Sequence, residues 1–301
     1  LKKAARQTVG PELERRIEII IETSLIELDD DFKIYWEKSP IGKLITGRDY
    51  LNPKIELLVD DILEQSLRKK LIIFLEKWLK NKIDTILKSL VDLKDLKEKN
   101  SSIKALAYQL YENNGVLKRI QVSEYLDNLG QNERKTLRDL GVKFGRYHVF
   151  LHRLIKPEAV SLRALLWKNY HQKYFNLKPP TFGLNFLDNE NPKNKHFMLL
   201  CGFEKFDSFY VRIDILERLF MQIINSTTEK LKEIKMIPEM LNLLGCSKDN
   251  FKKLLKNMDY KIIEKDNEVF FKYNPKKTFK KVDKKIKKES PFEVLKNLNF
   301  N

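Results

Sequence analysis

One amphipathic stretch limits what the first third of the chain can fold into. In "LRKKLIIFLEKWLKNKIDTILKSL" apolar side chains recur three and four residues apart, the spacing of a helix buried along one face. The stripe consists of Leu71, Phe74, Leu75, Trp78, Leu79, Ile86 and Leu87. A second helix is predicted after Pro11. Between the two, "FKIYW" alternates like a short strand, and "SPIGKLITGRDYLNP" carries the Gly and Pro residues of a loop. We therefore expect a helical bundle over residues 1–100.

The next block, residues 101–176, reads as short helices followed by a hairpin. Gly115 and Gly141 stand where two of these helices should end. "VKFGRYHVFL" then alternates as two short strands on either side of Gly145. A stretch rich in Pro and Asn follows, so residues 177–204 are predicted to connect two domains.

The last block, residues 205–275, has the outline of a winged helix-turn-helix. An amphipathic helix is followed by a shorter one ending at Gly245, a third with Ser247 as its N-cap, and two alternating strands. The lysine-rich residues 276–301 are predicted to be a flexible basic tail. The expected fold is mainly α with small β hairpins, a helical bundle followed by a C-terminal winged-helix-like module.

The positive charge of the chain is unevenly distributed. The 301 residues carry a formal net charge of +16, of which residues 101–180 hold +8 and residues 261–301 hold +6, while 1–100 and 181–260 hold +1 each. Two basic blocks separated by nearly neutral ones are typical of surfaces that meet a polyanion. Nucleic acid is the leading candidate, ahead of an acidic membrane surface or an acidic protein.

The first basic block mixes cations with aromatic residues. From Arg138 to Lys173 eight basic residues face only two acidic ones, and Phe144, Tyr147 and Trp167 lie among them. Basic groups neutralise phosphates and aromatic faces can stack bases. The alternative is that the aromatic residues are core and the cations are solvated. The candidate phosphate contacts here are Lys143, Arg146, Arg153, Lys156, Arg163 and Lys168.

The third helix of the last block offers further candidates. Its apolar residues follow helical spacing and should face the core, which leaves lysines on or beside the opposite face. In helix-turn-helix modules this exposed surface meets the duplex. A solvated lysine face without a ligand is the alternative. The candidates in this block are Lys248, Lys252, Lys253, Lys256, Lys265 and Lys272.

Signatures of catalysis and of metal binding are scarce. His148 and His152 in "RYHVFLH" are four residues apart, but the stretch favours a strand and lacks the glutamate of a zinc-protease helix. "IGKL" lacks two required positions of a phosphate-binding loop, and the two cysteines show no CxxC spacing. We expect no catalytic residue, metal or cofactor in this chain, and no membrane span. Cysteine usage suggests a reduced, cytoplasmic protein.

Several ordered segments together resemble one protein family. They include "SLIELDDDFKIYW", "ALAYQLYENNGVL", "LRDLGVKFGRYHVFLHRLIKPEAVSLRALLW", "VRIDILERL" and "IPEMLNLLGCSKDNFKKLLKNMDYK". They are similar to the C-terminal half of bacterial superfamily 2 DNA/RNA helicases of the alphaproteobacterial type, relatives of the mitochondrial degradosome RNA helicase. The resemblance implies a parent with two motor domains that use ATP and magnesium. It supplies no catalytic residue for this chain, which begins at Leu1 and reads as a fragment.

Three functions are therefore open. The first is the nucleic-acid-contacting accessory region of such a helicase, with single-stranded RNA or DNA, possibly duplex, as its partner. The second is a stand-alone winged-helix regulator of duplex DNA. The third is an adaptor that docks a protein partner such as a nuclease.

Overall fold

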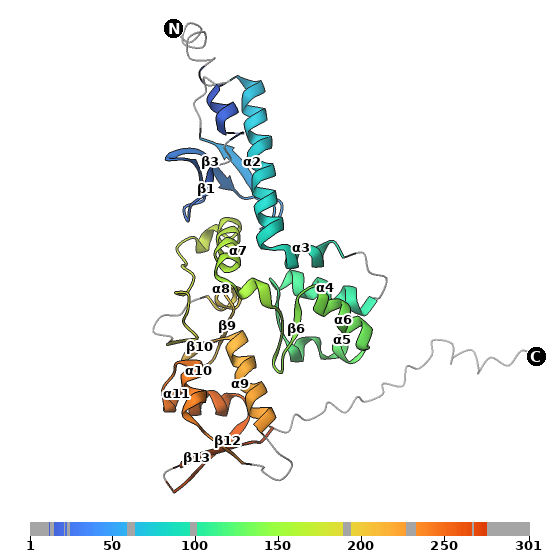
Figure 1. Cartoon of the computed structure of the whole chain (residues 1–301), viewed down its shortest axis with the longest axis vertical. Coiled ribbons are helices and arrows are strands. Elements are labelled where there is room, and N and C mark those ends of the chain that lie inside the picture. Colours follow the sequence, from blue (N-terminus) through green and yellow to red (C-terminus); the bar gives the residue numbers. More distant parts are fainter. Residues whose placement is uncertain are drawn as a thin grey trace, which may run out of the picture.

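The molecule is elongated, with its N-terminal part and its last hairpin at opposite ends of one axis. In this computed structural model an N-terminal sheet and a long helix form one end, and the last hairpin forms the other (Figure 1). The structure describes residues 12, 15–20, 22, 25–58, 64–96, 101–188, 194–226, 233–266 and 268–275. The predicted tail, 276–301, lies outside the described residues.

A four-stranded antiparallel sheet and one long helix make the N-terminal part. The strands are β1 (Ile26–Leu28), β2 (Lys33–Trp36), β3 (Ser39–Ile45) and β4 (Lys54–Leu57), paired in chain order. Helix α2 (Gln65–Ile86) runs along the sheet and buries every fourth residue from Leu67 to Ile83. At Gly42 a Cβ would lie 3.3 Å from the Glu56 carbonyl oxygen and 3.3 Å from the Ile55 side chain, so glycine relieves crowding between β3 and β4. The short helix α3 (Lys88–Lys94) follows.

The remaining elements form three successive repeats. Each has a helix, a strand, one to three short helical elements and a hairpin, and in each sheet the last strand lies between the other two. The first repeat, residues 101–151, consists of α4 (Ser101–Glu112), β5 (Val116–Lys118), η1 (Arg119–Val122), α5 (Ser123–Asp127), α6 (Gln131–Asp139), β6 (Val142–Phe144) and β7 (His148–Leu151). Its sheet has the order β5-β7-β6.

The second and third repeats follow directly. After η2 (His152–Ile155), the second repeat, residues 157–212, contains α7 (Pro157–Tyr170), η3 (Gln172–Tyr174), β8 (Phe186–Asp188), α8 (Lys195–Leu200), β9 (Phe203–Lys205) and β10 (Phe209–Arg212). The third repeat, residues 213–273, contains α9 (Ile213–Ser226), β11 (Ile234–Lys235), α10 (Pro238–Leu244), α11 (Lys248–Asn257), β12 (Tyr260–Lys265) and β13 (Glu268–Tyr273). Their sheets have the orders β8-β10-β9 and β11-β13-β12.

The corner between the last helix and the hairpin has the same geometry in all three repeats. The residue immediately before the first hairpin strand has a positive φ: 92° at Gly141, 86° at Gly202 and 61° at Asp259. A left-handed residue reverses the chain within a single step, and glycine reaches this conformation without the steric cost of a Cβ. The shared corner places each hairpin directly against the helix that precedes it.

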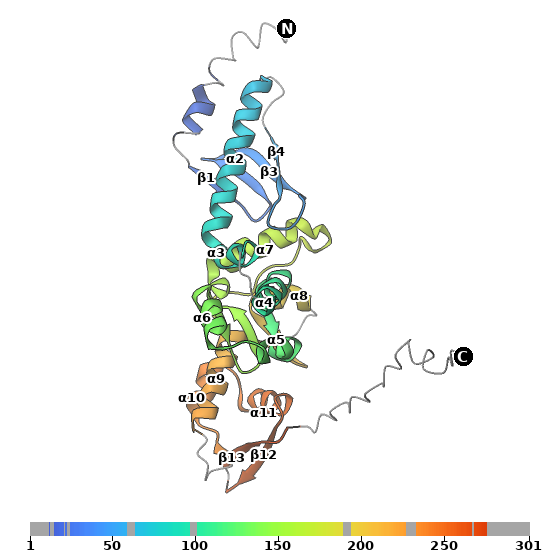
Figure 2. The same cartoon turned by 90° about the vertical axis from the view of Figure 1, so that its right-hand side faces the viewer.

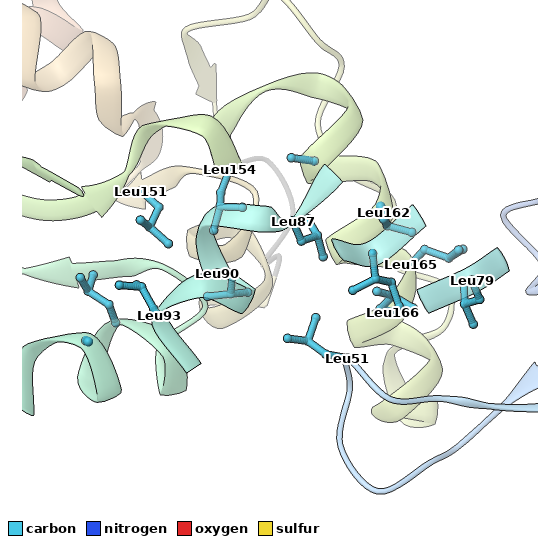
Figure 3. Close-up of a cluster of buried hydrophobic side chains, with 14 of the residues drawn as sticks. Leu51, Leu79, Leu87, Leu90, Leu93, Leu151, Leu154, Leu162, Leu165 and Leu166 are labelled. Atoms are coloured by element: carbon cyan, nitrogen blue, oxygen red, sulfur yellow. The ribbon is translucent and has the colours of Figure 1, made fainter. Parts of the chain in front are cut away.

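Buried leucines join the N-terminal part to the first repeat. One continuous core includes Leu79 of α2, Leu90 of α3, Leu151 of β7 and Leu166 of α7 (Figure 3). Helix α7 lies between the N-terminal sheet and the first repeat (Figure 2). A second core lies around α9, α10 and α11, and it also buries Phe209 and Val211 of β10, so apolar side chains join the second repeat to the third.

The predicted fold class was wrong. The described residues are 52% helix and 22% strand, with four small antiparallel sheets, which is a mixed α and β architecture. The expected helical bundle contains a sheet, because "SPIGKLI" forms β3 although its Ser, Pro and Gly residues are typical of a loop. Residues 177–204, expected to be a connection, hold β8 and α8.

Several local predictions were confirmed. The helical stripe corresponds to α2, "FKIYW" contains β2, and the strands on either side of Gly145 are β6 and β7. Gly245 ends α10 in the left-handed conformation, and the Ser247 side chain accepts a hydrogen bond from the Asn250 amide at 3.2 Å. Sequence patterning therefore located many elements while missing their assembly.

Replacing Gly141 with alanine tests the repeated corner. A Cβ at this position would meet only Ser89, at 3.8 Å, so the substitution adds backbone strain with little steric conflict. We expect the free energy of unfolding to fall by about 1 kcal/mol, measured by urea denaturation. Asn132→Ala, at an exposed position of α6, is the control and should change it by less than about 0.5 kcal/mol. An equal change in the free energy of unfolding for the two variants would contradict a requirement for glycine at this corner.

Candidate nucleic-acid interface

A hollow of about 700 Å³ lies where the three repeats meet. We call it the junction cavity. The first repeat contributes the end of β5 and the turn between β6 and β7, the second contributes the start of α8 and the β9–β10 turn, and the third contributes α9 and the corner between α11 and β12. Its basic lining residues are Lys118, Arg119, Arg146, Lys195 and Lys205. Its acidic lining residues are Glu204, Asp207 and Asp259.

A buried histidine at the base of this cavity ties the repeats together. His148 on β7 of the first repeat is 3% exposed. Its Nδ1 lies 3.0 Å from Glu217 Oε1 on α9, and its Nε2 lies 3.3 Å from Glu204 Oε2 on β9. A neutral imidazole has one donor and one acceptor nitrogen, so only the imidazolium form donates to both carboxylates. We call His148, Glu204 and Glu217 the histidine hub.

The charges of the hub nearly cancel. Lys118 Nζ donates to Glu204 Oε1 at 2.6 Å, which supplies a second cation for the second carboxylate. Burial opposes protonation of His148, but its hydrogen bonds to Glu204 and Glu217 outweigh burial and raise the pKa of the imidazole. Burial alone would raise the pKa of Glu204, whereas the hydrogen bonds from His148 and Lys118 lower it overall.

Glu217 also fixes the hairpin turn that carries Arg146. Its carboxylate accepts hydrogen bonds from the backbone amides of Arg146, Tyr147 and His148, the last two at 2.9 and 2.7 Å. A Cβ at Gly145 would overlap this carboxyl group, which explains why a glycine stands there. The turn is therefore set by a residue 69 to 71 positions further along the chain. The exposed Arg146 side chain reaches over the ring of Tyr273, 5.8 Å from its centroid.

Two of the predicted phosphate contacts were wrong, because the fold buries their side chains. Arg163 is 0% exposed and donates to the carbonyl oxygens of Asn114, Leu154 and Leu200. Burial lowers its pKa to about 10. Lys168 is 6% exposed and lies over the ring of Phe32. Both cations stabilise the contact between α7 and neighbouring elements.

The other candidates in the first basic block are exposed, but the structure does not gather them in one place. Arg146 lines the junction cavity, whereas Lys143 on β6 and Lys156 before α7 flank His152. Burial and, after it, the charge of Lys143 lower the pKa of His152. Arg153 is exposed within η2. Of the candidates predicted between residues 138 and 173, Arg146 alone lines the junction cavity.

The lysines of the third repeat divide into two groups. Lys248 and Lys253 on α11 and Lys272 on β13 are exposed. Lys252 donates to Glu264 at 2.5 Å and Lys265 to Glu233 at 2.8 Å, so these two cations are already paired. Lys256 is exposed and lies on the side of α11 that faces β12.

Sequence reasoning missed most of the junction cavity. Lys118, Arg119, Lys195 and Lys205 stand in four different elements of two repeats, and none of them belongs to a recognisable spacing. The partners of His148 lie 56 and 69 residues away. For these partners the sequence offered one signal, Gly145 in the β6–β7 turn, because a glycine at such a position can indicate that another group approaches the backbone closely.

Other site types receive no support from the described parts of the chain. In those ranges no group of three or more His, Cys, Asp or Glu side chains is arranged to hold a metal ion. None of the helices found there combines the length and apolar character needed to cross a bilayer. Comparison of the chain with protein-family models, curated proteins and solved structures finds no match in any of the three.

Replacing His148 with alanine tests the histidine hub. The change leaves two buried carboxylates facing a single lysine, so we expect the free energy of unfolding to fall by about 3 kcal/mol near pH 6. A raised pKa in the folded state means that the stabilisation by His148 is complete below the unfolded value of 6.5 and is lost as pH rises through the folded pKa. Urea denaturation from about pH 6 to 9 should therefore show the two proteins converging.

His152→Ala is the matched control for this series. Since the pKa of His152 is lowered, any stabilisation linked to its titration grows as pH rises, the opposite trend. A difference between the wild type and His148→Ala that stays constant with pH would exclude an imidazolium in the hub.

Proposed function

We propose that the chain binds nucleic acid at the junction cavity, as the accessory region of an ATP-dependent DNA/RNA helicase that guides the strand during unwinding. One observation carries the proposal: five basic side chains from the first and second repeats line a single concave surface. One of the three opposing carboxylates, Glu204, is neutralised by Lys118 and His148. The remaining imbalance favours a polyanion.

The shape and lining of the cavity favour a nucleic-acid strand over other polyanions. Proteins that bind single strands combine a positive groove for the backbone with aromatic rings for the bases. Tyr147 and Phe206 line the wall beside the cations, half-buried because one side of each ring packs against Phe220 and Phe209 respectively. Because the turn carrying Arg146 and Tyr147 is fixed by Glu217, these side chains are positioned before a ligand binds.

The helicase part of the proposal is supported by the sequence resemblance. The resemblance runs through "LRDLGVKFGRYHVFLHRLIKPEAVSLRALLW", which contains the hub histidine and the β6–β7 turn. In this proposal ATP and magnesium belong to the motor domains of the parent enzyme. The residues of this chain contribute phosphate contacts and no catalytic group.

Binding of a fluorescently labelled oligouridylate tests the proposal. Anisotropy titrations at rising salt should give an affinity that falls steeply, with a log–log slope of about −0.7 for each neutralised phosphate. The double variant Lys195→Glu/Lys205→Glu should bind roughly tenfold more weakly, about 1.4 kcal/mol. Its salt slope should be shallower by about 1.4, which corresponds to two lost contacts.

Lys69→Glu/Lys70→Glu carries the same change in charge on exposed positions near the start of α2, in the N-terminal part of the molecule. This control should bind like the wild type. If both double variants lose affinity equally, binding depends on overall charge and the junction cavity is not the site. Absence of binding by the wild type would contradict the proposed function.

A further inference from the structure

A second hollow in the third repeat shares a lining residue with the junction cavity. A groove of about 520 Å³ lies between α11 and β12, and Asp259 lines both it and the junction cavity. Asp259 is the left-handed residue at the corner between the two elements. We call the second hollow the α11–β12 groove. The shared residue makes the two hollows neighbours around one corner of the molecule.

The α11–β12 groove is also basic. Lys252, Lys256 and Lys261 line it, together with the acidic residues Asp259 and Glu264. The hydrogen bond and charge of Lys252 lower the pKa of Glu264, which therefore stays ionised and remains paired with Lys252. Lys256 and Lys261 are exposed. The groove thus extends the row of cations that begins in the junction cavity.

We infer that the two hollows form one continuous track for a single nucleic-acid strand, which leaves the junction cavity past Asp259 and follows the α11–β12 groove. This inference rests on the proposed function and specifies it further. The track contains eight basic side chains and four carboxylates, two of which, Glu204 and Glu264, are already paired with lysines. Phosphates passing along it would meet cations in both hollows.

The arrangement favours a single strand over a duplex. A duplex would be expected to use the outward face of α11, where Lys248 and Lys253 are exposed, as in modules that place a helix in the major groove. The track lies instead in hollows between elements, with Arg146 and the exposed ring of Tyr273 beside it. A flexible single strand can bend around the corner at Asp259, whereas a duplex is stiff over this length.

The length dependence of the salt slope tests the track. Two labelled oligothymidylates are compared, one of about 4 nucleotides and one of about 15, within the range of site sizes known for single-strand binders. A longer strand has more binding registers and gains affinity on any site, but the slope reports only the phosphates neutralised. We expect the log–log salt slope of the wild type to be steeper by at least about 1.4 for the longer strand, which corresponds to two additional neutralised phosphates.

The variant Lys256→Glu/Lys261→Glu should abolish that gain. Its slope for the longer strand should fall to the slope for the short strand, while binding of the short strand in the junction cavity stays close to that of the wild type. Lys248→Glu/Lys253→Glu makes the same change in charge on the outward face of α11, outside both hollows. The track predicts that this variant keeps the steeper slope.

Four results would overturn the track. A wild-type slope that does not grow with length, or a gain that survives Lys256→Glu/Lys261→Glu, would leave nucleic-acid binding intact and remove the track. Loss of the gain only in Lys248→Glu/Lys253→Glu would place the strand on the outward face. Tighter binding of a duplex than of a single strand of equal length would also exclude it. If neither strand binds the wild type, the proposed function itself fails.

Discussion

One buried ionic contact joins all three repeats. His148 of the first repeat lies between Glu204 of the second and Glu217 of the third, and the geometry at its two nitrogens requires the imidazolium form. Buried charges are costly unless each is paired and hydrogen-bonded, so the hub stabilises only the arrangement that brings all members together. Apolar packing joins the same parts, because the core around α9 and α11 also buries Phe209 and Val211 of the second repeat, and the hub adds a directional polar contact to it.

The same contact shapes the proposed binding surface. Glu217 holds the backbone of the β6–β7 turn, which carries Arg146 and Tyr147 into the junction cavity, and Glu204 draws Lys118 toward its wall. Structure and recognition are therefore linked through shared carboxylates. A change at the hub would disturb the cavity even if every lysine and arginine of its lining were kept.

The sequence allowed prediction of elements with strong local patterns and of little beyond them. The α2 stripe, the helix that Ser247 caps and the strands beside Gly145 follow from periodicity and capping. The threefold repeat was missed because many of its strands have only two to four residues. The amino-acid sequences of the three hairpins also have few residue types in common at matching positions. The corner residues Gly141, Gly202 and Asp259 are the common feature; Gly141 was expected to end a helix, but the conformation that all three share is visible only in the structure. Arg163 was predicted to contact phosphate at the surface but is buried, because composition alone cannot distinguish a buried guanidinium from an exposed one.

Photo-crosslinking of a bound strand tests the central claim most directly. A 4-thiouridine oligonucleotide is irradiated in complex with the full chain, and the modified peptides are identified by mass spectrometry. Binding in the junction cavity predicts adducts on the peptides that line it, around Tyr147 and Phe206, and their loss in Lys195→Glu/Lys205→Glu. Adducts confined to residues 276–301 or to the N-terminal sheet would contradict it.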